Sequence, residues 1–297
     1  MIAIPAGTLR MGSAEFYPEE GPVHERVVDA FELDVHPVTN EEFDAFVTAS
    51  GYVTVAEREL DPGDFAGADP VDLVPGSMVF TPTSGPVDLR SWRHWWRWQP
   101  GASWREPAGP GSSIEDRLRH PVVQVCFEDA SAYARWSGKR LPTEVEWEWA
   151  ARGGLVGARF AWGDDERPDG RLMANTWQGS FPYRNTGAEG WVGTAPVGTF
   201  PANGFGLVDM TGTVWEWTSD YFAPRHRIPG SVTPDAGPRA NLLASASVEP
   251  GSRIPRRVLK GGSHLCSAEY CFRYRPAARS AQSEDTATTH IGFRCAR

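Results

Sequence analysis

Two cysteines near the C-terminus, Cys266 and Cys271, are separated by four residues in a segment rich in glycine and arginine. Thiolates are soft ligands that suit Cu(I), zinc and iron–sulfur centres, and two of them can hold a Cu(I) ion while leaving room for a third sulfur. A local disulfide or a pair of inert thiols is the alternative. A chain of this length does not need a disulfide scaffold, but the spacing by itself does not decide between these possibilities.

The remaining cysteines and the histidines give weaker patterns. Cys126 and Cys295 are isolated from each other and from the pair, which argues against a closed zinc site made of four cysteines. His264 lies beside the pair and is a minor ligand candidate. The seven histidines show no H-x-x-x-H or H-E-x-x-H spacing, so the sequence predicts no local histidine metal site.

Oxygen-bearing side chains occur in the turn-rich second half of the chain, at Asn175, Glu189, Asp209 and Glu216. Calcium accepts this mixture of carboxylate, amide and backbone carbonyl oxygens. Each residue type is also common as a turn or cap residue, so both interpretations stand at this stage.

The amino-acid composition limits the classes of protein to which the chain can belong. With 29 Lys and Arg against 38 Asp and Glu, the net charge of −9 disfavours a nucleic-acid partner. The sequence shows neither a secretory signal nor an apolar run that could span a bilayer, so we expect a cytoplasmic protein without a membrane partner. No repeat or clear linker interrupts residues 1–297, which favours one domain. The 31 Gly, 25 Pro and 13 Trp indicate a loop-rich fold with few long helices.

The sequence predicts some of the helices and strands that must position these residues. Thr39 and Thr143 each precede a Glu by three residues, which predicts helices that begin there and end near Gly51 and Gly153. A third helix is expected at 129–137. Short strands are expected at 2–4, 8–11, 27–35, 120–126, 257–260 and 291–295.

A tryptophan-rich stretch within residues 57–113 shows no regular periodicity. It contains Trp92, Trp95, Trp96, Trp98 and Trp104. The cluster is interpreted either as a small core under a long loop or as the wall of a peptide groove.

Several segments together resemble the formylglycine-generating enzymes, or sulfatase-modifying factors, of the prokaryotic type, and the resemblance covers essentially the whole chain. The matching runs are Lys260-Gly261-Gly262-Ser263 with the two cysteines, Arg273 to Arg279, Gly292-Phe293-Arg294-Cys295, Ile4-Pro5-Ala6-Gly7 with Met11-Gly12-Ser13, Gly138 to Glu144 with Glu146-Trp147-Glu148, and Trp215-Glu216-Trp217. The cysteine pair within its Gly-Gly-Ser context separates the aldehyde-forming branch from its relatives.

The resemblance implies a mixed α/β, loop-rich fold of the formylglycine-generating type, related to C-type lectins. It implies an oxidoreductase that uses O2 to convert a cysteine in an unfolded sulfatase, within a Cys-x-Pro-x-Arg or Cys-x-Ala-x-Arg motif, to Cα-formylglycine. Cys266 and Cys271 are implied to hold Cu(I), the substrate thiolate becoming the third sulfur ligand. Cys271 is expected to be the more buried of the two. Ser263 matches a serine near the oxygen pocket.

Structural calcium also follows from the resemblance. The first site is expected to use Asn175, the Thr176 carbonyl, Glu189 and the Trp191 carbonyl. The second is expected to use Asp209, the Gly212 and Val214 carbonyls, and Glu216. Thr213 departs from the usual Asn of the Gly-Asn-Val-Trp-Glu pattern without removing a ligand.

Two other functions compete with this interpretation. One is a non-catalytic, lectin-like module that binds a peptide or glycan, against which the cysteine pair argues. The other is a sulfoxide synthase acting on small thiols, for which the chain lacks the histidine spacing and the additional length of that branch.

Overall fold

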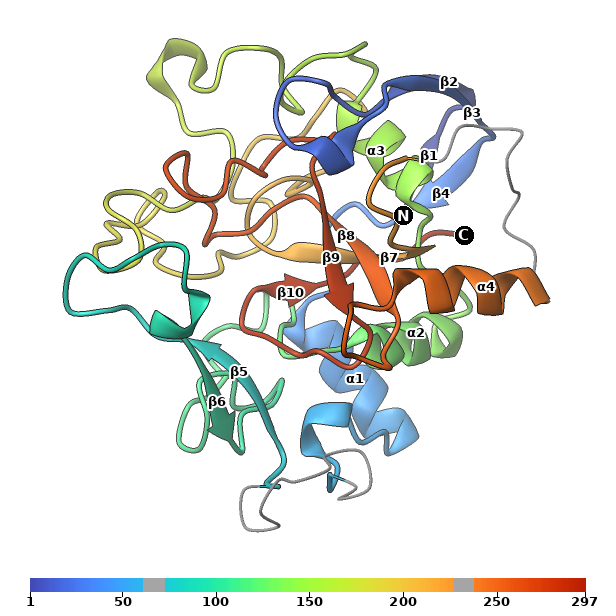
Figure 1. Cartoon of the computed structure of the whole chain (residues 1–297). Coiled ribbons are helices and arrows are strands. Elements are labelled where there is room, and N and C mark those ends of the chain that lie inside the picture. Colours follow the sequence, from blue (N-terminus) through green and yellow to red (C-terminus); the bar gives the residue numbers. More distant parts are fainter. Residues whose placement is uncertain (61–72, 227–237) are drawn as a thin grey trace.

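The computed structural model describes residues 1–60, 73–226 and 238–297, and of residues 238–240 only the backbone. The helices are α1 (Asn40–Ser50), α2 (Phe127–Trp136), α3 (Glu144–Arg152) and α4 (Pro238–Ser247). The strands are β1 (Ile2–Ile4), β2 (Gly7–Met11), β3 (His24–Val28), β4 (Phe31–Leu33), β5 (Gly76–Phe80), β6 (Trp96–Pro100), β7 (Trp215–Tyr221), β8 (Arg256–Lys260), β9 (Arg279–Ser283) and β10 (Ile291–Gly292). The mixed α/β, loop-rich fold with few long helices is confirmed (Figure 1).

The capping residues set the ends of the two best-predicted helices. Thr39 accepts a hydrogen bond from the Glu42 amide at 3.3 Å, and Glu42 accepts one from the Thr39 amide at 2.8 Å. This reciprocal capping satisfies amides that have no partner inside the helix. Gly51, at φ 68°, ends α1 in the left-handed conformation that suits glycine. Thr143 and Glu146 repeat the capping box at the start of α3.

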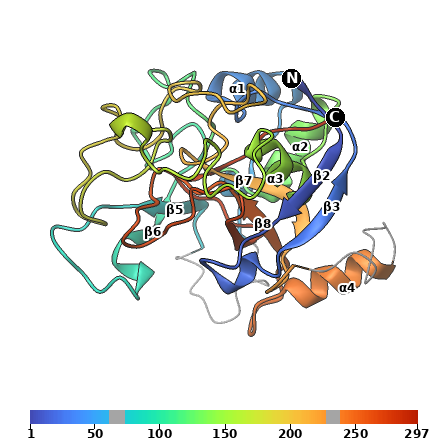
Figure 2. The same ribbon diagram turned by 90° about the horizontal axis from the view of Figure 1, so that it is seen from above.

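A four-stranded sheet in the order β10-β7-β8-β9 lies at the centre of the fold. β10 pairs parallel to β7, and the other neighbours are antiparallel. Three two-stranded ladders, β1-β4, β2-β3 and β5-β6, surround it. The two termini lie close together (Figures 1 and 2), because the backbones of Glu32 and Arg297 exchange two hydrogen bonds.

An aromatic core packs between the sheet and the helices α1 and α2. Phe43 and Phe46 of α1 contact Tyr133 of α2, whose ring lies 5.3 Å from Phe293 next to β10. Cys266 belongs to the same buried cluster. The cysteine loop therefore rests on the main core rather than on a peripheral loop.

The strand predicted at 120–126 is wrong. Val122 and Val125 are buried as a strand pattern suggests, but Gln124 has a φ of 62° and breaks the extended path. The Val122 amide bonds to the Val38 carbonyl and the Gln124 amide to the Thr288 carbonyl, so no continuous ladder forms. The 27–35 strand is split into the end of β3 and β4, and β10 is shorter than predicted. Five of these helices and strands were not predicted: β5, β6, β7, β9 and α4.

The tryptophan stretch contains both buried and exposed rings, so the small-core interpretation holds for part of it and the peptide groove stays a prediction. Trp95 and Trp104 are buried in two different hydrophobic clusters. Trp92 and Trp98 are about half exposed, at 49% and 45%. Trp96 opens β6 and packs 4.8 Å from the His290 ring, at the edge of the cavity described below.

No helix in the described part of the chain has both the length and the apolar character needed to cross a membrane.

Candidate functional site

The turn after β8 brings the two cysteines together. The Cys266 amide donates to the Ser263 carbonyl at 2.9 Å, and the Cys271 amide donates to the Ser267 carbonyl at 2.8 Å. These two turns place the Cys266 and Cys271 sulfurs 2.9 Å apart. Both thiols are free.

Glycine is required where β8 enters this turn. Gly262 has a φ of 71°, and a Cβ there would lie 2.8 Å from the Arg273 carbonyl oxygen. Any larger residue would be strained and would push the chain after Cys271 away from the turn. The Gly-Gly-Ser sequence thus holds the two arms of the cysteine loop in contact.

The pair is asymmetric in exposure and charge. Cys266 is only 1% exposed, and burial raises the pKa of its thiol. The hydrogen bond from the Cys266 thiol lowers the pKa of Cys271, and the nearby Arg273 guanidinium lowers it further. Of the two sulfurs, Cys271 is therefore the one whose thiolate form is more favoured. Because Cys271 is partly exposed, the prediction that it is the more buried cysteine is wrong: Cys266 packs into the main core.

Arg273 is itself held in place by the N-terminal part of the chain. Its Nη2 donates to Glu19 Oε1 at 2.5 Å, and its guanidinium lies 3.9 Å from the centre of the Tyr17 ring. The Tyr17 hydroxyl accepts a hydrogen bond from the Phe272 amide. The 3-10 helix Pro18–Glu20 and the residue before it therefore position the cation beside Cys271.

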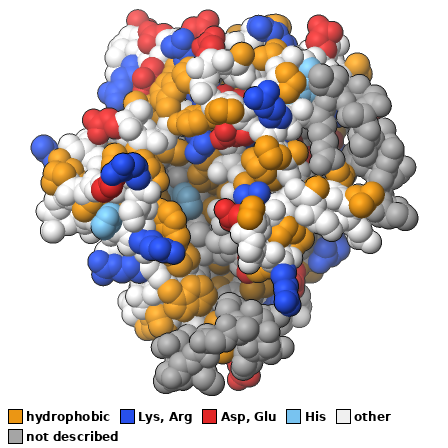
Figure 3. All heavy atoms as spheres, in the orientation of Figure 1, with side chains coloured by type: hydrophobic (Ala, Val, Ile, Leu, Met, Phe, Trp, Pro, Cys, Tyr) orange, Lys and Arg blue, Asp and Glu red, His pale blue; other side chains and the backbone are white. Residues whose placement is uncertain are grey.

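The cysteines open into a cavity of about 180 Å³, here called the cysteine cavity. Its other lining residues are Trp95, Trp96, Phe181, Trp215, Ser263, Leu265, Tyr270, Arg273, Ser280 and His290. Figure 3 shows that this face of the molecule is hollowed beside the β5-β6 lobe, with hydrophobic side chains around the hollow. Such a site exposes sulfur chemistry to a substrate while limiting the access of water.

Ser263 and His290 supply polar groups to the cavity. Ser263 is fully buried, and its hydroxyl oxygen accepts from the Leu265 amide at 3.2 Å, which leaves its O–H available as a donor. Burial lowers the pKa of His290 to about 3, so this imidazole is neutral at pH 7. Its Nδ1 lies 2.6 Å from the Thr288 hydroxyl oxygen.

The sequence analysis identified only some of the other residues that line the cavity. Arg273 was noted only as part of a motif, and Trp96 only as one of a cluster, whereas Tyr270 and His290 were not singled out. Tyr270 stacks on Phe181 at 4.6 Å, a contact between segments that are far apart in sequence. The Arg273-Tyr274-Arg275 run shortly after Cys271 was the one local sign of a cation near the sulfur pair.

At the first predicted calcium site, the structure brings Asn175 to the 189–193 loop. Asn175 Nδ2 donates to the Gly193 carbonyl at 2.9 Å, while its Oδ1 is buried without a hydrogen-bond partner among the described residues. Glu189 is exposed, the Trp191 carbonyl accepts from the Ala188 amide, and the Thr176 carbonyl accepts from Gln178. The unpartnered amide oxygen suits a hard cation.

At the second predicted site, Asp209 and Glu216 are both buried but differ in their partners. Glu216 already accepts from Trp147 Nε1 at 2.7 Å and from the Arg294 guanidinium at 2.8 Å. Burial raises the pKa of Asp209 to about 6, and the Gly198 amide only partly offsets this effect. A cation would compensate the Asp209 charge, and Gly212 and Val214 lie in the same curved loop, in which Thr213 has a φ of 57°.

Among the described residues, the predicted metal sites do not appear as clusters of three or more ligand side chains. Within residues 1–60, 73–226 and 238–297, no group of three or more His, Cys, Asp or Glu converges as a metal site. The donor sets at the two predicted calcium positions include carbonyl and amide oxygens, and the cysteine pair offers two sulfurs. The soft sulfur pair suits Cu(I), and Asn175 Oδ1 and the Asp209 carboxylate are the oxygen donors that a Ca²⁺ ion would satisfy.

Comparison with known proteins identifies the class. The family of sulfatase-modifying factor enzyme 1-like domains matches residues 1–297, and the chain belongs to this family. It is similar to the formylglycine-generating enzyme of Mycobacterium tuberculosis, with 63% identity over 99% of this chain and 96% of that protein. It is also similar to the inactive C-alpha-formylglycine-generating enzyme 2 of Mus musculus, with 37% identity over 100% of this chain and 85% of that protein. Among solved structures, PvdO from Pseudomonas aeruginosa matches with a TM-score of 0.63 and 25% identity, over 99% of this chain and 92% of that chain.

Proposed function

We propose that this protein is a copper-dependent oxidase that converts the cysteine of a Cys-x-Pro/Ala-x-Arg motif in an unfolded sulfatase to Cα-formylglycine. The observation that carries the proposal is the pair of free thiols 2.9 Å apart on the wall of an aromatic-lined cavity. The names of the prokaryotic relatives support the same reaction.

The chemistry balances with O2 as the oxidant and a thiol reductant. The substrate Cβ exchanges its C–S bond and one C–H bond for a C=O bond, and the sulfur leaves as sulfide. O2 accepts four electrons, two from the substrate and two from the reductant, which becomes a disulfide. Both oxygen atoms of O2 become water, and a water molecule supplies the aldehyde oxygen when the thioaldehyde is hydrolysed and releases its sulfur.

Cys266 and Cys271 would hold Cu(I), which supplies the one-electron chemistry with O2 that protein side chains lack. Arg273 holds Cys271 as the thiolate, the form in which a thiol binds a metal. The neighbouring rings of Trp96 and Tyr270 enclose the substrate sulfur and keep bulk water away from it. The Ser263 hydroxyl orients a small oxygen species in the cavity by donating a hydrogen bond to it. Ca²⁺ at the Asn175 and Asp209 positions would stabilise the surrounding loops.

Family membership alone does not establish activity, because the family includes a relative named as inactive. Nothing in the described structure favours the non-catalytic module over the oxidase, and the cysteine pair is the discriminating feature. A module that only binds a peptide has no use for two adjoining free thiols of unequal pKa.

The test uses reduced, copper-loaded protein, a Cys-x-Pro-x-Arg peptide and an excess of small-molecule thiol. We expect one Cu(I) per chain and the conversion of the peptide to an aldehyde, followed by mass spectrometry. Cys271→Ala should lose both, whereas Cys295→Ala, which removes a buried thiol outside the cavity, should keep both. Absence of aldehyde from the copper-loaded wild type would reject the oxidase, and turnover by Cys271→Ala would reject its role as a ligand.

A further inference from the structure

A second and larger hollow adjoins the cysteine cavity. It has a volume of about 400 Å³ and is here called the lateral chamber. Its lining residues are Asn40, Phe80, Pro82, Pro107, Ala108, Ile114, Arg117, Pro121, Val123, Trp177, Tyr183, Asn185, Val192, Gly193, Thr194, His264, Leu265 and Thr289. Leu265 lines both spaces, and it immediately precedes Cys266 in the chain. The two spaces therefore share a wall at Leu265, next to the thiol that the substrate cysteine approaches in the proposed function.

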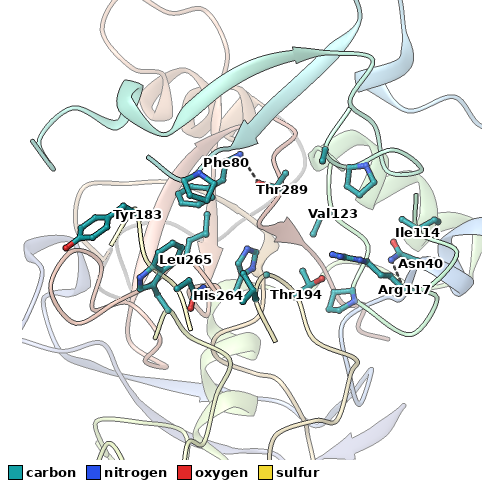
Figure 4. Close-up of a pocket in the computed structure, with 18 residues that line it drawn as sticks. Asn40, Phe80, Ile114, Arg117, Val123, Tyr183, Thr194, His264, Leu265 and Thr289 are labelled. Carbon is teal, nitrogen blue, oxygen red and sulfur yellow. Dashed lines mark hydrogen bonds between the residues drawn. The ribbon is translucent and has the colours of Figure 1, made fainter. Parts of the chain in front are cut away.

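The walls of the lateral chamber are mainly apolar. Figure 4 shows Phe80 and Leu265 at one end of it and Val123 and Ile114 toward the other. Its volume falls within the range of pockets that take drug-sized molecules, roughly 300–1,000 Å³. It therefore has room for a bulkier group than the proline or alanine of the motif.

Two buried polar atoms of the lining have no hydrogen-bond partner among the described residues. Asn40 is 3% exposed, and its Nδ2 is fixed by the Arg117 carbonyl at 2.8 Å, which leaves Oδ1 as the unused acceptor. Trp177 is 6% exposed, and its Nε1 is an unused donor. Buried groups of this kind are costly unless a ligand satisfies them. One acceptor and one donor match the N–H and C=O of an extended peptide.

The charges of the lining disfavour a cation. Arg117 is the positively charged residue in it, and its ion-pair partner Asp116 lies outside the lining, 3.7 Å away and 80% exposed. His264 is buried, and its Nδ1 lies 2.7 Å from the Thr213 carbonyl oxygen. The lining, as far as the structure describes it, contains no Asp or Glu. An arginine side chain placed here would meet a like charge and no carboxylate.

We propose that the lateral chamber binds a large, uncharged apolar side chain that flanks the recognition motif of the substrate polypeptide. Asn40 Oδ1 and Trp177 Nε1 bind the backbone of that segment, and the arginine of the motif lies outside the chamber. This inference rests on the proposed function for the identity of the polypeptide. It adds a determinant of specificity that acts through binding and not through the sulfur chemistry.

The test measures binding separately from turnover. Fluorescent peptides in which serine replaces the reactive cysteine are compared with Ala, Leu or Lys at each position flanking the motif. At one flanking position we expect Leu to bind about tenfold more tightly than Ala, as burial of a leucine side chain implies, and Lys to bind more weakly than Ala. Equal affinities for Ala, Leu and Lys at all positions would overturn the proposal.

Variants of the chamber identify where the preference arises. Ala108 is an exposed loop residue of the lining, so Ala108→Trp should fill the chamber and abolish the Leu preference without unfolding the protein. Ala108→Glu should instead favour the Lys peptide. Val156→Trp, at a position 79% exposed and outside the lining, is the matched control and should change nothing. A Leu preference that survives Ala108→Trp would overturn the assignment to this chamber.

Turnover of the corresponding cysteine peptides separates this inference from the proposed function. If the Leu preference is present and depends on Ala108, the chamber is confirmed even when no peptide yields aldehyde, and only the oxidase proposal fails. If aldehyde forms with equal KM for the Ala and Leu peptides, the oxidase stands and the chamber proposal fails.

Discussion

Glu20 and Arg275 form a buried ion pair in which two guanidinium nitrogens donate to the two carboxylate oxygens at 2.9 and 2.5 Å. Their side chains are 0% and 1% exposed. The pair joins the 3-10 helix Pro18–Glu20 to the chain that follows the cysteines, and a second ion pair, between Glu19 and Arg273, links the same two segments. The position of the cation beside Cys271 thus depends on contacts across almost the whole sequence.

Removing one partner of this pair should cost much of the stability of the fold. Glu20→Gln leaves the Arg275 charge buried without its counter-ion, which typically costs about 3–5 kcal/mol. Urea denaturation should show that loss in the free energy of unfolding. Glu32→Gln, in the exposed pair with Arg297, is the control and should cost about 0–1 kcal/mol. Similar losses in the two variants would contradict the structural role of the buried pair.

The four cysteines should differ in reactivity. Cys271 is partly exposed and has a lowered pKa, so in reduced, metal-free protein it should be alkylated first. Cys126 and Cys295 are buried, and burial raises the pKa of each thiol, so they should react only after unfolding. Peptide mapping after brief treatment with iodoacetamide measures the order. Faster labelling of Cys266 than of Cys271 would reverse the proposed charge assignment.

Arg273 should control the ionisation of Cys271. Arg273→Gln removes a cation that favours the thiolate, so the pKa of Cys271 should rise, while Arg273→Lys should retain most of the effect. Thiolate absorbance of the metal-free Cys126→Ala/Cys295→Ala background, followed against pH, gives the titration directly. An unchanged titration in Arg273→Gln would show that the hydrogen bond from Cys266 suffices by itself.

The sequence was most informative where a local interaction determines the structure. The ends of α1 and α3 follow from the capping boxes of Thr39 and Thr143 and from the left-handed glycines Gly51 and Gly153, all within a few residues of the helices they cap. The 120–126 segment shows the opposite case. Its buried valines follow a strand pattern, but its amides bond to two distant segments, which no local pattern reveals.

The sequence predicted which residues carry the chemistry of the candidate site, but not how those residues are arranged in space. The cysteine spacing and its glycine context pointed to the pair, and the turn that joins the two sulfurs is local. The relative burial of the two thiols depends on the core beneath Cys266, and the walls of the cavity come from Trp96, Phe181 and His290, which only the tertiary fold brings together. Contacts of this kind leave no periodicity in the sequence.

Asp209 gives a test of the second calcium position through the pH dependence of stability. Burial raises its folded pKa from the ordinary value near 3.8 to about 6, so between these values the folded state binds more protons than the unfolded state. The contribution of Asp209 to stability therefore falls as pH rises from about 4 to 6, by up to about 3 kcal/mol at 1.36 kcal/mol per pKa unit. Calcium-free protein should gain stability from Asp209→Asn at pH 7 and little at pH 4.

Added calcium should reverse the ranking of the two proteins at pH 7. A bound cation favours the ionised Asp209, so calcium should raise the melting temperature of the wild type more than that of Asp209→Asn. The size of the increase depends on the calcium concentration relative to the Kd for the folded state. Magnesium at the same concentration is the control, because it dehydrates reluctantly and seldom occupies sites made of several carbonyl oxygens. If calcium stabilises the two proteins equally, Asp209 is not a ligand, and its raised pKa reflects burial alone.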